Sequence, residues 1–253
     1  MNILITNDDG INSAGLIALV QTISEIANVT VVAPDRERSA TAHAITMHKP
    51  LRVEEIEIPG CDALGYKVNG TPSDCVKLAL EALLNNAPDL VLSGINRGAN
   101  LGTDVIYSGT VSAAFEAALL GVPGIALSVT SRENVEFNHA ADFAKKLCQQ
   151  VSRKIFPKDT LLNVNIPNIK PERIAGIAIT HLGTIRYKDS FERRTDPRGK
   201  VYYWLAGEAI EDTNDKGSDV WAIKNNFISI TPILIDLTKY DIIDTIRDWN
   251  LKL

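Results

Sequence analysis

Residues 2–15 read NILITNDDGINSAG, and this stretch indicates how the chain begins to fold. Its first five residues are mostly β-branched or otherwise apolar, which is typical of a buried β-strand. The run NDDG then breaks the apolar pattern as a turn, and a helix is expected after it. Neighbouring side chains on a strand point to opposite faces, so Asp8 and Asp9 can converge on one target only where the backbone turns, which Gly10 makes easy. Two converging acids suggest a bound cation.

Strand-like and helix-like segments alternate outward from this stretch over about 180 residues. Further strands are expected at 29–34, 89–94, 124–130, 161–167 and 173–180, and helices at about 15–27, 73–85, 109–121 and 136–151. This alternation is typical of an α/β fold with a mainly parallel sheet covered by helices on both faces. Residues 51–70 alternate in polarity instead and predict an inserted antiparallel hairpin beside the sheet.

The character of the sequence changes after Leu182. The following stretch is charged and rich in aromatic residues, and it predicts hairpins and loops. A short helix at 218–226, a strand at 227–233 and a final amphipathic helix at 238–253 are then expected. We therefore predict a Rossmann-like three-layer core over 1–182 and a C-terminal arm, with a returning strand and helix, over 183–253.

The arm carries three aromatic residues that look exposed. Tyr202, Tyr203 and Trp204 follow one another in the sequence. Such a cluster is typical of a subunit interface. The alternative is that these side chains pack on the core of the same chain.

Composition restricts the kind of protein. The chain has 253 residues, 45% of them hydrophobic and 23% charged, which is typical of a globular protein with a real core. The net charge of -5 and the lack of a dense basic run argue against binding a nucleic-acid polymer. Cys61, Cys75 and Cys148 are widely spaced without a CxxC pair, so we expect reduced core cysteines. No leader-like or membrane-spanning apolar segment is visible, so we expect a cytoplasmic protein that does not bind membranes.

Polar residues gather where three of the expected strands end. The first strand ends in NDD, the second leads into residues 33–46, and the strand at 89–94 leads into residues 95–114, all rich in oxygen-bearing or glycine residues. In an open parallel sheet the ligand crevice lies outside the carboxyl ends of the strands. We therefore expect the functional site at this edge.

Four oxygen donors at this edge suit a hard divalent cation. Asp8 and Asp9 supply carboxylates, Asn96 an amide oxygen and Ser39 a hydroxyl, a set that fits Mg²⁺ or Mn²⁺ better than a thiolate-type zinc site. Two carboxylates neutralise a divalent ion and leave it able to accept an anionic ligand oxygen, as phosphoryl transfer requires. The alternative is that the two acids only form a turn and cap a helix.

A second group lies where a loop runs into the helix expected from residue 109. Ser108, Gly109, Thr110 and Ser112 have small side chains, hydroxyls and free backbone N–H groups that can hold a phosphate with help from the helix dipole. The alternative is an ordinary helix cap with Ser108 or Thr110 as the capping residue.

Several common motifs are missing. The sequence has no GxGxxG after the first strand, no GxxxxGK[ST], no GxSxG and no HExxH, which argues against dinucleotide redox, P-loop and nucleophile-elbow chemistry. The four histidines show no metal-binding spacing. His43 can line the crevice, but a solvent-facing histidine or one satisfied by a neighbour is the favoured interpretation.

Four runs of residues together resemble the SurE family of stationary-phase survival proteins. They are NDDG (7–10), APDRERSA (33–40), SGINRGANLGTDVIYSGTVSAA (93–114) and SDVWAIKNNFISITPI (218–233). The resemblance spans nearly the whole chain in order. It departs from the family at Ala40, where a glycine commonly follows the serine, and at Ser112, where a glycine is also common.

The resemblance implies a fold, an activity and a site. The family consists of metal-dependent nucleotidases that remove phosphate from nucleoside 5′- and often 3′-monophosphates, and some members shorten polyphosphate. Its metal ligands correspond here to Asp8, Asp9, Ser39 and Asn96, which implies one Mg²⁺ or Mn²⁺ per subunit. The fold implied is a Rossmann-like core with a C-terminal arm exchanged between the subunits of a homodimer or tetramer.

The resulting hypothesis is in-line hydrolysis of a phosphomonoester. The metal offsets charge while Ser108, Gly109 and Thr110 hold phosphoryl oxygens. The nucleophile is either water activated at the metal by Asp8 or Asp9, or Asp8 itself. Two rival interpretations remain, a nucleotide or phosphate sensor without turnover and an oligomeric scaffold with an idle crevice.

Overall fold

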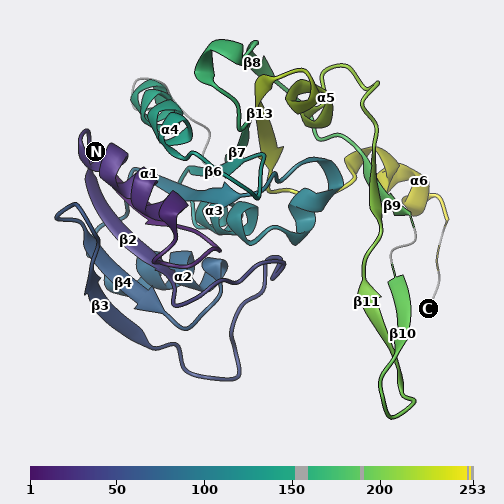
Figure 1. Cartoon of the computed structure of the whole chain (residues 1–253), viewed down its shortest axis with the longest axis horizontal. Helices are drawn as coiled ribbons and strands as arrows, with labels where there is room; N and C mark the ends of the chain where they lie inside the picture. Colours follow the sequence, from purple (N-terminus) through teal and green to yellow (C-terminus); the bar gives the residue numbers. More distant parts are fainter. Residues whose placement is uncertain (152–158, 189–190, 250, 252–253) are drawn as a thin grey trace.

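The centre of the molecule is one large sheet. The computed structural model describes residues 1–151, 159–188, 191–249 and 251. The strands of the sheet are β1 (Asn2–Thr6), β2 (Asn28–Pro34), β3 (Val53–Glu57), β4 (Leu64–Val68), β5 (Leu90–Arg97), β6 (Gly124–Val129), β7 (Thr160–Ile166), β8 (Gly176–Ile179) and β13 (Phe227–Leu234). Their order across the sheet is β3-β4-β2-β1-β5-β6-β7-β13-β8 (Figure 1). All but the β3–β4 and β7–β13 pairs are parallel, so the predicted mainly parallel α/β fold is confirmed.

Strand β1 fixes where the functional edge lies. It pairs in parallel with β2 on one side and with β5 on the other, with Thr6 opposite Ser93. Its residues from Ile3 to Thr6 are fully buried, as expected for a central strand covered on both faces. Because the three strands run the same way, the polar segments that follow them meet at one edge of the sheet.

Helices cover both faces of the sheet, as predicted. They are α1 (Ala14–Ser24) and α4 (Asn138–Val151) on one face, and α2 (Pro72–Leu78), the π-helical turn η1 (Ala79–Leu83) and α3 (Gly109–Leu119) on the other. Alternate residues of β1 divide between the two cores. Ile3 and Ile5 pack in the cluster that includes α1 and α4, and Leu4 packs in the cluster that includes α2 and α3. The helix predicted at 73–85 consists of α2 followed directly by the π-helical turn η1, so its α-helical part is shorter than predicted.

The predicted hairpin at 51–70 forms, but it belongs to the sheet. Strands β3 and β4 pair antiparallel, and β4 pairs in parallel with β2. The hairpin thus extends the edge of the sheet by two strands, where we expected it to lie beside the sheet.

The arm leaves the body as two antiparallel ribbons, as the sequence predicts. Their strands are β9 (Ile185–Lys188), β10 (Phe191–Thr195), β11 (Val201–Leu205) and β12 (Glu208–Glu211), with β10 paired to β11 and β12 paired to β9. Figure 1 shows the β10–β11 hairpin extending away from the sheet. Residues 189–190 lie outside the described part of the chain.

The chain then returns to the body. The short helix α5 (Asp219–Lys224) leads into β13, which lies between β7 and β8. The carboxylate of Asp219 is buried and accepts hydrogen bonds at 2.8 Å from the backbone N–H groups of Gly102 and Gly183. Desolvation raises the pKa of Asp219, while these hydrogen bonds lower it. Asp219 therefore ties the base of the arm to the 3-10 turn η2 (Gly102–Tyr107), which directly precedes α3.

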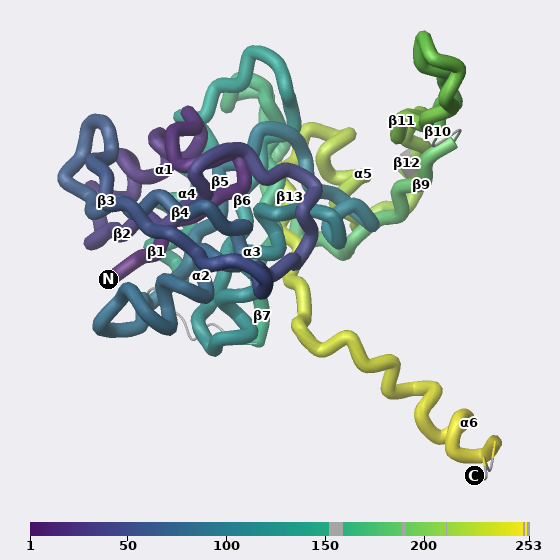
Figure 2. The backbone as a smooth tube through the Cα atoms, turned by 90° about the horizontal axis from the view of Figure 1, so that it is seen from below, coloured from purple at the N-terminus to yellow at the C-terminus, as the bar shows by residue number. Residues whose placement is uncertain are grey.

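The C-terminal helix is shorter than predicted. A 3-10 turn η4 (Tyr240–Ile242) leads into α6 (Ile243–Arg247), whereas the sequence predicts a helix over 238–253. Asn250 and residues 252–253 of that prediction lie outside the described residues. Figure 2 shows α6 at the end of a separate extension, far from the body and from the ribbons. Because the described part of the body does not lie against α6, its helical turns depend mainly on the local sequence.

The prediction of reduced core cysteines is confirmed for two of the three. All three cysteines are free; Cys75 and Cys148 are buried and Cys61 is half-buried, so only the first two are core residues. Burial raises the pKa of Cys148 to about 12. Within the described residues, no helix is both long enough and apolar enough to span a bilayer.

Candidate functional site

Asp8 lies against the N-terminus of α3. Its side chain is buried, and Thr110 donates a hydrogen bond from Oγ1 to Asp8 Oδ1 at 2.6 Å. A Cβ added at Gly109 would lie 2.9 Å from the Cβ of Asp8, so only glycine allows the helix to approach this closely. The structure thus brings together the first predicted acid and the predicted phosphate-binding turn, residues 108–110.

Asp9 lies on the other side, against the end of β5. The backbone N–H of Arg97 donates to Asp9 Oδ2 at 3.2 Å. The neighbouring Asn96 donates from Nδ2 to the carbonyl oxygen of Gly98 at 2.8 Å, which fixes the orientation of its amide. Asp9 and the predicted amide ligand therefore come from adjacent strand ends.

Ser39 lies on the long connection after β2, which we call the Ser39 loop (residues 35–50). The N–H of Arg38 donates to the carbonyl oxygen of Asp8 at 2.7 Å and holds the start of the loop on the end of β1. The hydroxyl of Ser39 donates to Glu37 Oε1 at 2.6 Å. The sequence reasoning missed Glu37, although its place two residues before the predicted ligand was a visible signal.

The backbone after Ser39 explains one departure from the family pattern. Ala40 has φ of 55° and Ala42 has φ of 49°, both in the left-handed region that favours glycine. A glycine after the serine would adopt this conformation without strain. Ala40 adopts it at some cost, so the rest of the Ser39 loop must hold it in place.

The two acids, Asp8 buried and Asp9 half-buried, concentrate negative charge at this edge of the sheet. The pKa of Asp8 is raised to about 6. Burial is the main cause, the charge of Asp9 adds to it, and the hydrogen bond from Thr110 acts in the opposite direction. The pKa of Asp9 is also raised, mainly by burial, while the hydrogen bond from the Arg97 N–H lowers it and the charge of Glu37 raises it. Over the described residues, no lysine, arginine or histidine forms an ion pair with either carboxylate.

This donor set fits a divalent cation. Two desolvated carboxylates without an ion-paired partner are costly, and a divalent ion offsets that cost. The described residues contain no cluster of three or more His, Cys, Asp or Glu suited to a metal. The predicted set includes only two residues of those types, and its remaining donors are the amide of Asn96 and the hydroxyl of Ser39.

The hydroxyls of the phosphate-binding turn are already engaged. Ser108 is the N-cap of α3, and its Oγ accepts a hydrogen bond from the N–H of Val111 at 3.1 Å. Ser112 donates from Oγ to the carbonyl oxygen of Ser108 at 2.6 Å, and Thr110 is bonded to Asp8. The capping alternative is therefore realised at Ser108. In the first turn of α3 the backbone N–H of Gly109 is left to bind an anion, and that of Thr110 also interacts with the Asp8 carboxylate.

A cavity of about 360 Å³ opens beside Asp9. Its walls are formed by residues 9–15, residues 35–37, Arg97 and Phe137. Asn12 lines this cavity, whereas Asn7 is buried and donates from Nδ2 to Gly10 O and Ser13 Oγ. Asn7 therefore supports the turn and does not line the cavity.

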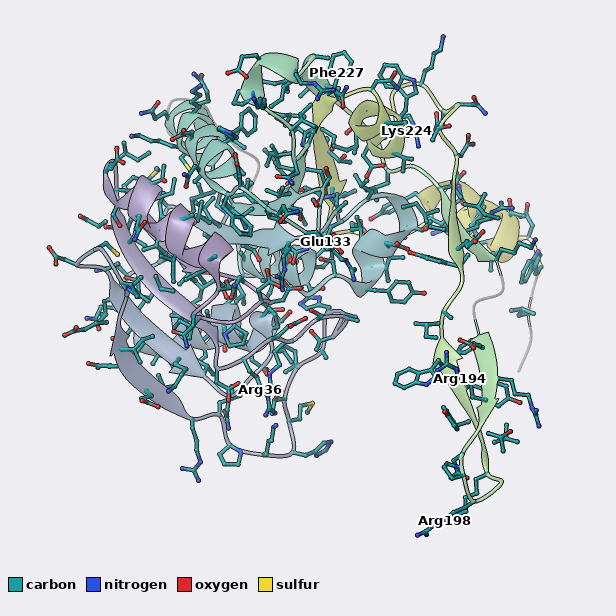
Figure 3. All side chains as sticks on the ribbon, viewed as in Figure 1. Arg36, Glu133, Arg194, Arg198, Lys224 and Phe227 are labelled. Atoms are coloured by element: carbon teal, nitrogen blue, oxygen red, sulfur yellow. The ribbon has the colours of Figure 1, made fainter. Side chains whose placement is uncertain are left out.

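His43 and the described part of the charged stretch at residues 186–194 also have defined positions relative to the site. His43 is satisfied by a neighbour, since its Nε2 lies 2.6 Å from Glu116 Oε2. Residues 186–194 are a charged stretch of the arm. Figure 3 shows Arg194 and Arg198 on the β10–β11 hairpin, away from Arg36 at the site edge, so the described part of this stretch does not cover the site.

Comparison with known proteins places this chain among relatives along its full length. A family model described as "Survival protein SurE" matches residues 3–189. A protein named 5'-nucleotidase SurE from Heliobacterium modesticaldum is 51% identical over 249 residues, covering 98% of this chain and 92% of that protein. One of the same name from Trichormus variabilis is 50% identical over 264 residues, covering 100% of both.

A solved structure agrees with the sequence comparison. The crystal structure of SurE protein from Aquifex aeolicus superposes with a TM-score of 0.88 at 41% identity, covering 99% of this chain and 100% of that one. The overall fold is thus shared along almost the whole of both chains. The chain belongs to the SurE family.

Proposed function

We propose that this chain is a 5′-nucleotidase, a phosphomonoesterase that hydrolyses nucleoside 5′-monophosphates to a nucleoside and phosphate. Full-length relatives at about 50% identity carry that name. The observation that carries the proposal is the contact between Asp8 and Thr110, which joins a buried carboxylate to a helix N-terminus suited to a phosphate. We extend the substrates to nucleoside 3′-monophosphates and to polyphosphate, because this site recognises the phosphoryl group itself.

The metal in this proposal is one Mg²⁺ or Mn²⁺ per subunit. Asp8, Asp9, Ser39 and Asn96 would hold it, and Ser39 would exchange its hydrogen bond to Glu37 for the ion. When bound, the ion supplies positive charge to phosphoryl oxygens and lowers the pKa of water.

The chain itself binds and orients the phosphoryl group. The N–H groups of Gly109 and Thr110 donate to its oxygens, with support from the dipole of α3. The Thr110 hydroxyl holds Asp8 in one orientation. Either a water oxygen attacks phosphorus after giving its proton to Asp8 or Asp9, or the carboxylate of Asp8 attacks directly. In both routes the bond from phosphorus to the ribose oxygen breaks, and that oxygen takes up a proton. In the second route water must then attack the phosphorus bound to Asp8, so that the bond to Asp8 breaks and phosphate is released.

The cavity beside Asp9 is our proposed site for the nucleoside. It shares Asp9 with the proposed metal ligands, and its volume of about 360 Å³ falls in the range of small-ligand pockets. Phe137 offers an aromatic surface in one wall, and Asn12 offers hydrogen-bonding groups. A nucleotide whose phosphate lies at α3 would then direct its base toward this cavity.

The organisation in which this site works is also a proposal. We propose that residues 1–182 are the catalytic core and that the arm, residues 183–253, joins the subunits of a homodimer or tetramer. Apolar side chains on β11 support this role, with Trp204 59% exposed and Leu205 77% exposed. The free cysteines fit a reducing compartment, and the cytoplasm is our proposed location.

The test is phosphate release from a panel of nucleoside 5′- and 3′-monophosphates and short polyphosphate. Each substrate is assayed with Mg²⁺, with Mn²⁺ and with EDTA. We expect metal-dependent turnover of the 5′-monophosphates that EDTA abolishes. Saturable nucleotide binding without turnover by the metal-loaded protein would contradict the proposal and favour a sensor.

A further inference from the structure

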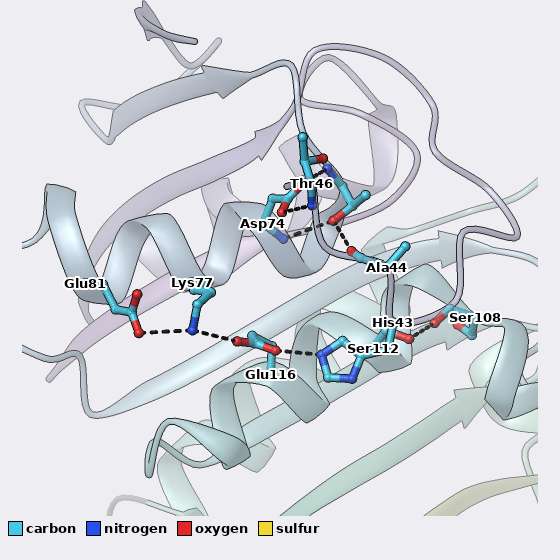
Figure 4. Close-up of polar contacts among 10 residues, drawn as sticks. His43, Ala44, Thr46, Asp74, Lys77, Glu81, Ser108, Ser112 and Glu116 are labelled. Carbon is cyan, nitrogen blue, oxygen red and sulfur yellow. Dashed lines mark hydrogen bonds and ion pairs between the residues drawn. The ribbon is translucent and has the colours of Figure 1, made fainter. Parts of the chain in front are cut away.

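The Ser39 loop crosses the N-terminal ends of α2 and α3 without forming a helix or strand of its own. It nevertheless carries Ser39, a proposed metal ligand. Its start is fixed by the bond from Arg38 N–H to Asp8, so the position of Ser39 depends on what holds the residues after it. Figure 4 shows this part of the loop lying against α2 and α3.

A charged cluster holds the loop at His43. The ring Nε2 of His43 lies 2.6 Å from Glu116 Oε2, and Glu116 is buried in α3, two turns after the phosphate-binding turn. Lys77 of α2 lies 3.6 Å from the other oxygen of Glu116 and 3.0 Å from Glu81 (Figure 4). The ring of His43 also meets the ring of Phe115 edge-on, with 5.3 Å between their centres. A buried carboxylate is costly unless it is paired. The Glu116 carboxylate therefore favours the conformation in which His43 and Lys77 lie against it, and this conformation keeps the loop on α3.

Hydrogen bonds on either side of His43 also join the Ser39 loop to the N-terminal ends of α2 and α3. The N–H of Ala42 donates to the carbonyl oxygen of Tyr107 at 3.2 Å. Thr71 donates from Oγ1 to the carbonyl oxygen of Ala44 at 2.7 Å, and Asp74 Oδ1 accepts from the N–H of Thr46 at 2.8 Å. These contacts enclose the left-handed residues Ala40 and Ala42, whose conformation persists only where surrounding structure holds it.

We propose that His43 is a positioning residue for the reaction. Through Glu116 it holds the Ser39 loop against α3, and so keeps the Ser39 hydroxyl at a fixed place relative to Asp8 and the phosphate-binding turn. His43 acts through the loop and through α3 without touching the phosphoryl group. This inference rests on the proposed function, because it concerns the same site, but the contact itself can be tested without turnover.

The test compares three variants with the wild-type chain. His43→Leu keeps the packing on Phe115 but removes the bond to Glu116. His43→Gln retains an N–H that can reach Glu116, so it should restore what His43→Leu loses. His48→Ala is the matched control, because His48 is an exposed histidine of the same loop.

Hydrogen exchange of the metal-free protein tests the contact. We expect the amides of Ala42 and Thr46 to exchange at least tenfold faster in His43→Leu, near the wild-type rate in His43→Gln, and at the wild-type rate in His48→Ala. Unchanged protection in His43→Leu would overturn the inference. The result does not depend on catalysis, so it stands or falls separately from the proposed function.

Calorimetric titration with Mn²⁺ and steady-state kinetics test positioning. In His43→Leu we expect Mn²⁺ to bind on the order of tenfold more weakly, which is typical of the loss of a group that supports a metal ligand. We also expect kcat to be lowered, while the KM for the nucleotide at saturating Mn²⁺ changes little. A merely structural role would lower the melting temperature and leave the Mn²⁺ affinity unchanged, and that outcome would overturn the proposal. If the wild-type chain lacks turnover while exchange and Mn²⁺ binding behave as expected, the proposed function fails and the positioning of Ser39 survives.

Discussion

At the scale of single residues, Asp8 is both a proposed metal ligand and a group whose protonation changes the free energy of unfolding. Burial raises its pKa to about 6 in the folded chain, against an ordinary value of 3.8. Between these values the folded state binds more protons than the unfolded state, so the free energy of unfolding falls as the pH rises from 4 to 6. At about 1.4 kcal/mol for each pKa unit, the metal-free protein loses roughly 3 kcal/mol through this one group.

The corresponding prediction is that Asp8→Asn stabilises the metal-free protein. An amide oxygen can still accept the hydrogen bond from Thr110, and the cost of a buried charge is gone. In EDTA at pH 8, urea denaturation should give a free energy of unfolding up to about 3 kcal/mol higher than wild type, and at pH 4 the two should be nearly equal.

Adding Mn²⁺ provides the control for this prediction. Binding to the folded state stabilises wild type by about 2.7 kcal/mol at a hundredfold excess over Kd, and Asp8→Asn should gain much less. An Asp8→Asn variant that is less stable than wild type in EDTA at pH 8 would contradict this account of Asp8.

The sequence could predict which residues gather at the site, but not how their atoms are used. Asp8, Asp9 and Asn96 follow from one rule, that parallel strands end at a common edge. The cap at Ser108 was one of the two expected alternatives, but the bond from the Thr110 hydroxyl to Asp8 could not be predicted, because it depends on how closely α3 approaches the end of β1. The pairing of His43 with Glu116 joins residues 73 positions apart, and no local pattern indicates such a pair.

At the scale of elements, a buried polar network fixes the loop that follows β5. The N–H of Asn100 donates to Asn165 Oδ1 at 2.9 Å, and its Nδ2 donates to Ser128 Oγ at 2.8 Å. Asn163 and Asn165 both donate from Nδ2 to the carbonyl oxygen of Asn100. Strands β6 and β7 thereby hold the loop that joins Asn96 to the turn before α3.

We predict that Asn165→Leu destabilises the fold by about 2–4 kcal/mol. The substitution leaves the buried N–H of Asn100 without its acceptor. A buried donor without a partner destabilises the folded state by its full desolvation free energy. Urea denaturation measures the effect. Asn168→Leu, at a half-buried asparagine just beyond β7 whose hydrogen bonds are exposed, is the control and should change stability by less than about 1 kcal/mol. Equal effects of the two variants would contradict the role of the network.

The order of elements could be predicted well, and their partners less so. Apolar periodicity located β1, β2, β5, β6 and β7 within a few residues, since each is a buried strand in a βα unit. The insertion of β13 between β7 and β8 could not be predicted, because it rests on two long-range pairings, antiparallel with β7 and parallel with β8. The short length of α6 also could not be predicted, since an amphipathic pattern describes a face and not whether anything covers it.

At the scale of the whole molecule, the arm exposes apolar side chains that a monomer has no reason to present. Phe191, Tyr203, Trp204 and Leu205 are at least 59% exposed on the β10–β11 hairpin. On α6 and just after it, Ile246 and Trp249 are also exposed. Figure 2 shows both segments standing away from the body. This is the distribution expected of surfaces that a second copy of the chain covers.

We predict that a double substitution, Trp204→Asp with Leu205→Asp, shifts the protein toward the monomer. Charges placed at the centre of an apolar interface oppose association. Size-exclusion chromatography with light scattering measures the mass. Leu119→Asp, at an apolar residue 50% exposed on the C-terminal end of α3, is the control and should leave the mass unchanged. A wild-type chain that is monomeric at micromolar concentration would contradict the role of the arm.

The central claim is that Asp8, held by Thr110 at the N-terminus of α3, forms part of a metal-dependent phosphomonoesterase site. The measurement that tests it most directly is the rate of phosphate release from a nucleoside 5′-monophosphate across a range of Mn²⁺ concentrations, for wild type and for Asp8→Asn shown to be folded by denaturation. We predict turnover in wild type that rises with Mn²⁺ to saturation, and a loss of at least about a thousandfold in Asp8→Asn, equivalent to about 4 kcal/mol of transition-state stabilisation. Turnover that persists in Asp8→Asn or in EDTA would contradict the claim.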